Sequence, residues 1–229
     1  MVFAFDRSSS ISPEARKAVA HAIYQVTETD NPANEYLVIA FSQTIKVVGD
    51  WSQDRQKLNL ALGEVVPESK GNTALYDACD IALKSLASAK SPHRVLVLIS
   101  DGQDNVSKLT LRQLRQALNE NSVTVYSIGI FDSSVGSSLG MEGQAILDEL
   151  AQVTGGKAFY PRKNKVFDTL DQIFLELRER YTVSFTPLSP AADNKWHAVK
   201  LKLKLPAQDE NGKKYPRLSI RSRRGYYDR

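Results

Sequence analysis

The sequence has little cysteine and histidine and no long apolar segment, and each shortage excludes a class of protein. Its one cysteine, Cys79, excludes an intrachain disulfide and any cysteine-rich zinc or iron–sulfur site. Cys79 also lies in the apolar stripe of a predicted helix, which favours a buried, unreactive thiol. The three histidines lack metal-ligand spacing, and we interpret them as surface or structural residues: His21, His93 and His197. No apolar run approaches the roughly 18–20 residues that cross a bilayer, so we predict no membrane span.

Composition places the chain among ordinary globular proteins, but its charge is uneven. Charged residues make up 24% of the 229 residues and hydrophobic residues 42%, which excludes disordered and collagen-like classes. Residues 1–180 carry 19 Lys and Arg against 22 Asp and Glu, a net charge of −3. Residues 181–229 carry 11 against 4, a net charge of +7. The length allows one large domain or one domain with an appendage, and the charge asymmetry predicts two units, 1–180 and 181–229.

Short apolar runs alternate with helical patterns through the first unit. The apolar runs are typical of strands buried on both faces: 2–5, 36–41, 95–100, 123–131 and 158–160. Apolar residues at helical spacing predict helices between them, around 13–26, 73–90, 111–118, 146–151 and 170–177. This alternation predicts a doubly wound, mostly parallel, Rossmann-like α/β sheet with helices on both faces. Residues 45–51 follow the second run too closely for a helical crossover, so we predict an antiparallel hairpin at a sheet edge.

The second unit has a different pattern, in which apolar and polar residues alternate. Three segments, 181–185, 199–205 and 217–221, predict antiparallel strands with one solvated, basic face, a C-terminal β segment. We interpret the lysines as residues that keep this face soluble and protect an edge. Nucleic-acid binding by these strands is a weaker alternative, because no aromatic residues interleave with the lysines as stacking platforms.

Three polar clusters fall where the first unit's loops are predicted to meet. The stretch DRSSS (6–10) directly follows the first strand, GNT (71–73) precedes a long helix, and SDG (100–102) follows the run at 95–100. Right-handed crossovers put the carboxyl ends of parallel strands at one edge of the sheet, where ligands bind near the switch in strand order. We therefore expect the three clusters to converge.

The side chains of these clusters have one chemical character. Asp6 and Asp101 offer carboxylate oxygens, and hydroxyl oxygens come from Ser8, Ser10 and Thr73. An all-oxygen set suits a hard cation, Mg²⁺ first, with Mn²⁺ or Ca²⁺ as alternatives. Five side chains, some acting through water, would leave one position of an octahedral ion open. Each cluster alone is explained by a turn or a helix cap, but all three at one edge predict a metal site.

The same residues resemble the metal-ion-dependent adhesion site (MIDAS) of von Willebrand factor type A domains. In that family DxSxS follows the first strand, a Thr precedes a helix and an Asp follows the fourth strand, an order that residues 1–180 reproduce. The resemblance implies that the serines bind the ion directly and that a Glu or Asp of a protein ligand takes the open position. Arg7 and Ser9 depart from the small or apolar residues usual there. We expect four residues to form the partner-binding rim: Arg7, Ser9, Asn72 and Gly102.

The tail resembles the ending of von Willebrand A-related domains that are expanded in acidobacteria, through the stretches YTVSFTP, WHAVKLKLK and RSRRGYY. Members of that group usually carry a secretion signal and another β segment before the first strand. The apolar start of this sequence reaches Asp6 too early to be a signal peptide, so we expect a piece of a longer, extracytoplasmic protein, soluble as it stands.

We therefore predict a non-enzymatic, metal-dependent protein-binding module. The Gly- and Ser-rich stretch 132–143 follows a strand at the same edge and is a candidate for the recognition rim. The rival hypothesis is a Mg²⁺-dependent phosphotransfer or hydrolase enzyme. Haloacid-dehalogenase-like phosphatases need a second acid where this chain has Ser8, and the sequence has neither a GxSxG elbow nor a phosphate-binding loop. No histidine lies in the three clusters to serve as a base.

Overall fold

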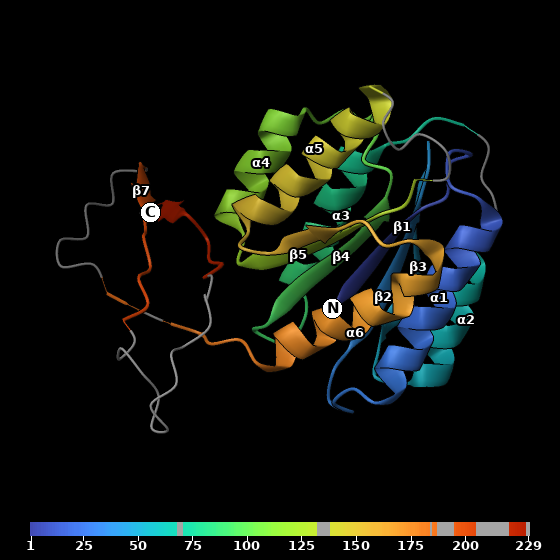
Figure 1. Cartoon of the computed structure of the whole chain (residues 1–229), viewed down its shortest axis with the longest axis horizontal. Helices are drawn as coiled ribbons and strands as arrows, with labels where there is room; N and C mark the ends of the chain where they lie inside the picture. Colours follow the sequence, from blue (N-terminus) through green and yellow to red (C-terminus); the bar gives the residue numbers. More distant parts are fainter. Residues whose placement is uncertain (68–70, 132–137, 184, 187–194, 205–219, 228–229) are drawn as a thin grey trace.

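A six-stranded sheet with helices on both faces makes up most of the computed structural model (Figure 1). The structure describes residues 1–67, 71–131, 138–183, 185–186, 195–204 and 220–227. A separate two-stranded antiparallel sheet lies in the C-terminal part. The predicted fold class, a Rossmann-like α/β sheet plus a C-terminal β segment, is confirmed. Among the helices of these described residues, none is long and apolar enough to cross a membrane.

The strand order of the large sheet is β3-β2-β1-β4-β5-β6. The strands are β1 (Val2–Asp6), β2 (Tyr36–Phe41), β3 (Ile45–Ser52), β4 (Arg94–Ser100), β5 (Val123–Gly129) and β6 (Lys157–Phe159). β3 runs antiparallel to β2 and the other neighbours are parallel, so the predicted edge hairpin is confirmed. β1 lies in the middle of the sheet, next to both β2 and β4.

Two apolar layers bury the two faces of this sheet. The helices are α1 (Pro13–Glu28), α2 (Arg55–Val65), α3 (Leu75–Ala87), α4 (Leu111–Glu120), α5 (Ser138–Val153) and α6 (Val166–Arg178), with the short η1 (Lys163–Lys165). Phe3 and Phe5 of β1 pack with α1, α2 and α6, whereas Val2 and Ala4 pack with α3, α4 and α5. This alternation explains why residues 2–5 of the first strand are all apolar: each of these side chains faces one of the two helical layers.

The start of α1 shows which of the nearby serine hydroxyls caps the helix. Ser12 is the N-cap, and its side chain accepts a hydrogen bond from the backbone N–H of Ala15 at 3.3 Å. Pro13 occupies the first helical position, and Glu14 adds an acid to the first turn. The helix is thus capped by Ser12, and neither Ser8 nor Ser10 is needed for that task.

The C-terminal part corrects the prediction of three strands at 181–185, 199–205 and 217–221. Its sheet pairs β7 (Trp196–Ala198) with β8 (Gly225–Tyr227), and residues 181–183 and 199–204 are not strands. Residues 184, 205 and 217–219 of these segments lie outside the described residues. Alternation forms a strand only where a neighbour buries the apolar side, and Leu201 and Leu203 remain 43% and 53% exposed.

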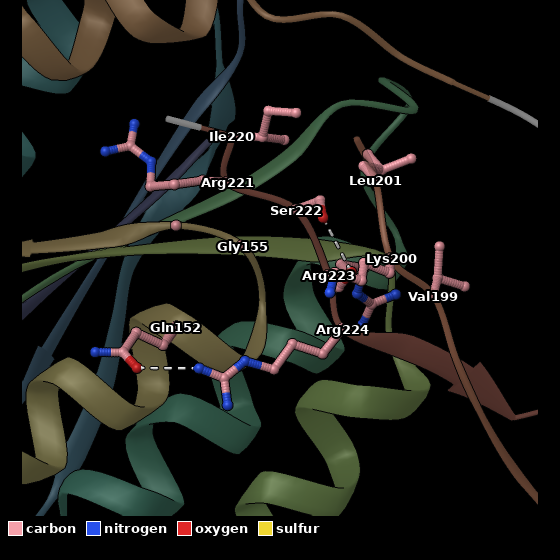
Figure 2. Close-up of a pocket in the computed structure, with 11 residues that line it drawn as sticks. Gln152, Gly155, Val199, Lys200, Leu201, Ile220, Arg221, Ser222, Arg223 and Arg224 are labelled. Atoms are coloured by element: carbon pink, nitrogen blue, oxygen red, sulfur yellow. Dashed lines mark hydrogen bonds between the residues drawn. The ribbon is translucent and has the colours of Figure 1, made fainter. Parts of the chain in front are cut away.

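Residues 220–224 attach this part to the first unit beside the turn at Gly155 (Figure 2). The Nη2 atom of Arg223 donates to the carbonyl of Leu118 at 2.6 Å, at the C-terminal end of α4. Arg221 pairs with Glu176 on α6. One arginine thus hydrogen-bonds α4 and another pairs with α6, so this stretch of the tail contacts helices from both faces of the sheet.

Candidate metal centre

The switch in strand order lies between β1 and β4 and brings two of the three polar clusters together. These strands are parallel neighbours with Phe5 opposite Ile99, so Asp6 and Ser100 stand side by side at the carboxyl ends. The chain leaves β1 towards β2 on one side, and β4 lies on the other. In open α/β sheets this is where ligands bind, because the loops diverge there and leave a crevice.

Asp6 is the buried centre of the cluster and is 0% exposed. Its Oδ1 accepts the backbone N–H of Ser8 at 2.9 Å, and its Oδ2 accepts the hydroxyl of Ser100 at 2.7 Å. Burial raises the pKa of Asp6 to about 6; hydrogen bonds from Ser8 lower it, and the nearby charge of Asp101 raises it further. Two carboxylates thus repel each other where Asp6 is shielded from water, and a bound cation would offset this repulsion.

The two serines of the DxSxS stretch point their hydroxyls at each other. The Oγ atoms of Ser8 and Ser10 are 2.9 Å apart. Ser8 is buried, whereas Ser9 and Ser10 are exposed. The contact between the hydroxyls of Ser8 and Ser10 lets these two side chains share one ligand. The backbone N–H of Arg7 donates to the carbonyl of Phe41 at 2.7 Å, which fixes the start of this loop on β2.

Thr73 is buried and is joined through its backbone to the loop that follows Asp101. Its N–H donates to Oδ1 of Asn105 at 2.7 Å, and its carbonyl accepts the N–H of Asn105 at 3.0 Å. The N-cap of α3 is Ala74, and no side chain caps this helix. Helix capping was the alternative explanation for Thr73, and its hydroxyl is not used in that way.

The loop that carries Asp101 packs closely on α5. Oδ1 of Asp101 accepts the N–H of Gln103 at 3.1 Å, which closes a turn. Gly102 has φ +82°, and a Cβ there would lie 2.2 Å from the carbonyl oxygen of Gly143. Of the candidate rim segment 132–143, residues 138–143 form the start of α5 and not a loop, and 132–137 lie outside the described residues; a role of this segment in the rim stays a prediction.

The donor chemistry fits a hard cation. Within the described residues no group of three or more His, Cys, Asp or Glu side chains could hold a metal, which leaves hydroxyls as the partners of the two aspartates. Direct contacts join Asp6, Ser8 and Ser10, and Asp101 is near enough to act on the pKa of Asp6. Among the described residues, the hydrogen bonds of Thr73 lead to Asn105 and Val106, in the loop after Asp101.

Two residues that shape this site received no role from the sequence, although Ser100 lies in one of the three predicted clusters. Ser100 bridges the two clusters, since its hydroxyl donates to Asp6 and accepts the N–H of Gly102 at 3.0 Å. Its place at the end of an apolar strand was a usable signal. Asn105 positions Thr73 from another loop, and nothing in its local sequence indicates that role.

The fold and these loops define a class: an α/β domain whose oxygen-bearing loops meet at the carboxyl edge of a mostly parallel sheet. The chain belongs to the von Willebrand factor type A domain family, whose profile matches residues 1–176. No curated protein is similar enough to count as a relative. The narrower resemblance to the acidobacterial group finds no support among these similarities.

Solved structures share this fold at low sequence identity. An aerotolerance-related membrane protein from Bacteroides fragilis, carrying multiple mutations to serine, has a TM-score of 0.62 at 14% identity, over 78% of this chain and 98% of that one. A von Willebrand factor type A structure from Catenulispora acidiphila has a TM-score of 0.60 at 20% identity, over 77% of this chain and 42% of that one. Proximal thread matrix protein 1 from the mussel byssus, with a zinc-occupied MIDAS motif, has a TM-score of 0.59 at 17% identity, over 77% of this chain and 47% of that one. This chain thus spans less than half of the last two proteins.

Proposed function

We propose that this chain is a non-enzymatic, metal-dependent protein-binding module. Domains of its family commonly act as metal-dependent interaction modules. Five residues would hold the ion, directly or through water: Asp6, Ser8, Ser10, Thr73 and Asp101. The observation that carries the proposal is the contact of Asp6, Ser8 and Ser10 within reach of the charge of Asp101. Mg²⁺ suits these oxygens best, with Mn²⁺ or Ca²⁺ as alternatives, and the zinc-occupied motif of the mussel protein supports a divalent ion here.

The ion would supply a positive Lewis-acidic centre, while the residues of the chain balance its charge and orient the oxygens. Asp6 and Asp101 balance its charge, while the buried start of the loop at Ser8 keeps the oxygens aimed at one point. A Glu or Asp side chain of a partner protein completes the coordination, because a carboxylate adds charge and direction that water lacks. Binding of the partner and of the ion is then coupled.

The rim beside the ion sets which partner fits. Ser9 and Asn72 are exposed and free to contact a protein, and Arg7 adds a cation that favours an acidic surface. Gly102 is buried against Gly143, so it shapes the loop rather than touching a partner. We propose residues 1–180 as the binding domain and 181–229 as an extension, of which residues 220–224 contact that domain. An extracytoplasmic location, in the envelope or secreted, is in keeping with the membrane protein and the byssus protein that share the fold.

Isothermal titration calorimetry with MgCl₂ tests the ion site directly. We expect one ion per chain, with the heat lost in Ser8→Ala and Ser10→Ala and kept in Ser9→Ala. The last is a matched control, because it removes a hydroxyl from the same loop at a position that faces solvent. Heat that survives in both ligand variants, or is equally reduced by the control, would contradict the assignment.

Partner binding needs a second experiment. Immobilised protein is exposed to the envelope fraction of the source cells in Mg²⁺ or in EDTA, with Ser10→Ala as the paired variant. We expect partners that elute with EDTA and that the variant fails to retain. Capture insensitive to both EDTA and the variant would contradict the proposal, and turnover of a phosphate ester that disappears with Ser10→Ala would favour the enzyme hypothesis.

A further inference from the structure

Arg16 is a cationic side chain that is fully buried. It lies in the first turns of α1, on the face that packs against the sheet, and is 0% exposed. A buried charge is costly unless hydrogen bonds replace the water that it loses. The contacts of its guanidinium therefore indicate what the residue is for.

Those contacts reach the backbone of two separate loops. The Nη1 atom of Arg16 donates to the carbonyl oxygens of Ser8 at 3.1 Å and Ile11 at 2.7 Å. Its Nε donates to the carbonyl of Val66 at 3.0 Å, directly after α2. One planar group thus joins the β1–α1 loop to the segment that leads from α2 towards α3.

These are the two loops that bring hydroxyls to the candidate metal centre. The first contains Ser8 and Ser10, and the second continues to Thr73. Arg7 makes a parallel connection, because its Nε donates to the carbonyl of Pro67 at 2.9 Å, next to the one that Arg16 holds. Two guanidinium groups from α1 and its preceding loop therefore bind consecutive carbonyls of the second loop.

We propose that Arg16 is a positioning residue for the metal centre, which holds the backbone of Ser8 and Ile11 against Val66 and thereby aims the serine hydroxyls before an ion arrives. This inference rests on the proposed metal-binding function. The fork of a guanidinium presents donors in fixed directions, which a lysine ammonium on a flexible stem does not reproduce. Residues that orient metal ligands in this way typically change metal affinity by about 10–100-fold when they are replaced.

A positioning role and a mere charge effect predict opposite results. The guanidinium donates to the backbone of the ligand-bearing loop, so its positive charge opposes a divalent cation nearby. If charge alone mattered, the neutral Arg16→Met would bind Mg²⁺ more tightly and Arg16→Lys would be unchanged. If the fork matters, both variants bind Mg²⁺ more weakly.

Arg55 offers a matched control. It also donates to three backbone carbonyls, those of Asn31, Asn34 and Gln53, at 3.1–3.5 Å. Arg55 lies at the start of α2, whereas Val66, which Arg16 binds, lies directly after the end of that helix. Arg55→Lys therefore removes the same kind of contact away from the metal loops. We expect it to alter stability without altering Mg²⁺ affinity.

The experiment measures Mg²⁺ affinity by calorimetry, thermal unfolding in EDTA, and hydrogen–deuterium exchange of residues 8–11 in the metal-free protein. We expect Arg16→Lys to fold, to weaken Mg²⁺ binding at least about tenfold and to speed exchange at residues 8–11. Arg16→Met should show the same changes if it folds. If Arg16→Met does not fold, Arg16→Lys alone tests whether Arg16 positions the loop.

Three results would overturn the inference. They are an unchanged Mg²⁺ affinity in folded Arg16→Lys, tighter binding in Arg16→Met, or equal exchange at residues 8–11 in all variants. A wild-type protein that binds no Mg²⁺, Mn²⁺ or Ca²⁺ would overturn the proposed function and this inference together. Wild-type binding with no effect of the Arg16 variants would overturn this inference alone.

Discussion

Replacing Asp6 by Asn should stabilise the metal-free protein at neutral pH and abolish cation binding at the same time. The carboxyl is 0% exposed, and its pKa of about 6 in the folded protein exceeds the ordinary value of 3.8. The folded state therefore holds this proton more tightly than the unfolded state does. Stability falls as the pH rises from about 4 to 6, and above pH 6 the full cost of burying the charge is present.

The magnitude follows from the two pKa values. Their difference corresponds to about 3 kcal/mol between the protonated and the charged carboxyl at pH 7. An asparagine avoids that cost, keeps an oxygen for the N–H of Ser8, and can donate to Ser100, whose hydroxyl accepts as well as donates. We expect Asp6→Asn to be more stable than the wild type in EDTA by about 1–3 kcal/mol.

Urea unfolding in EDTA at pH 7 and at pH 4 measures this effect, with Asp171→Asn on α6 as a control for loss of one charge. The stability gained by Asp6→Asn should disappear at pH 4, where the wild-type carboxyl is protonated. Added MgCl₂ should stabilise the wild type and leave the variant unchanged. A variant that is no more stable than the wild type at pH 7, or that still gains stability from Mg²⁺, would refute the reasoning.

Three further predictions concern the loops, the tail and the thiol. Gly102→Ala should weaken Mg²⁺ binding and lower stability, because the added Cβ would lie 2.2 Å from the carbonyl oxygen of Gly143; calorimetry and thermal unfolding measure both, and an unaltered Mg²⁺ affinity would contradict it. Arg223→Ala should lower the free energy of unfolding by about 1–3 kcal/mol, because the carbonyls at the end of α4 lose their donor, while Mg²⁺ affinity stays constant. Burial raises the pKa of the Cys79 thiol to about 12, so Ellman's reagent at pH 8 should label it only in urea; rapid labelling of the folded protein would contradict its burial.

The sequence predicts the elements whose burial is periodic and local. β1, β4 and α3 carry uninterrupted apolar runs or stripes, and each of them formed close to its predicted limits. α2 was missed because only Leu58, Leu62 and Val65 are buried in it, too short a stripe to stand out. The lysine-rich stretch 199–204 alternates like a strand but is not one, because its pattern does not specify a neighbour.

In the candidate site, too, the local features could be predicted from the sequence and the long-range ones could not. The order of Asp6, Ser8 and Ser10 along one turn is local, so the sequence predicts that they meet, and the hydroxyl contact between the serines agrees with it. The roles of Arg16 and Asn105 depend on loops distant in sequence. Their side chains bind backbone carbonyls and an N–H, and backbone groups have no signature in the sequence.

Crystals grown or soaked with MnCl₂ offer the most direct test of the central claim, that oxygens from three loops hold one hard divalent ion. Anomalous diffraction locates manganese without reference to the protein's own electron density. The account predicts one strong peak at the carboxyl edge, bonded at about 2.0–2.2 Å to oxygens of the DxSxS loop, with Thr73 and Asp101 bound directly or through water. No peak there, or a peak held by other residues, would contradict it.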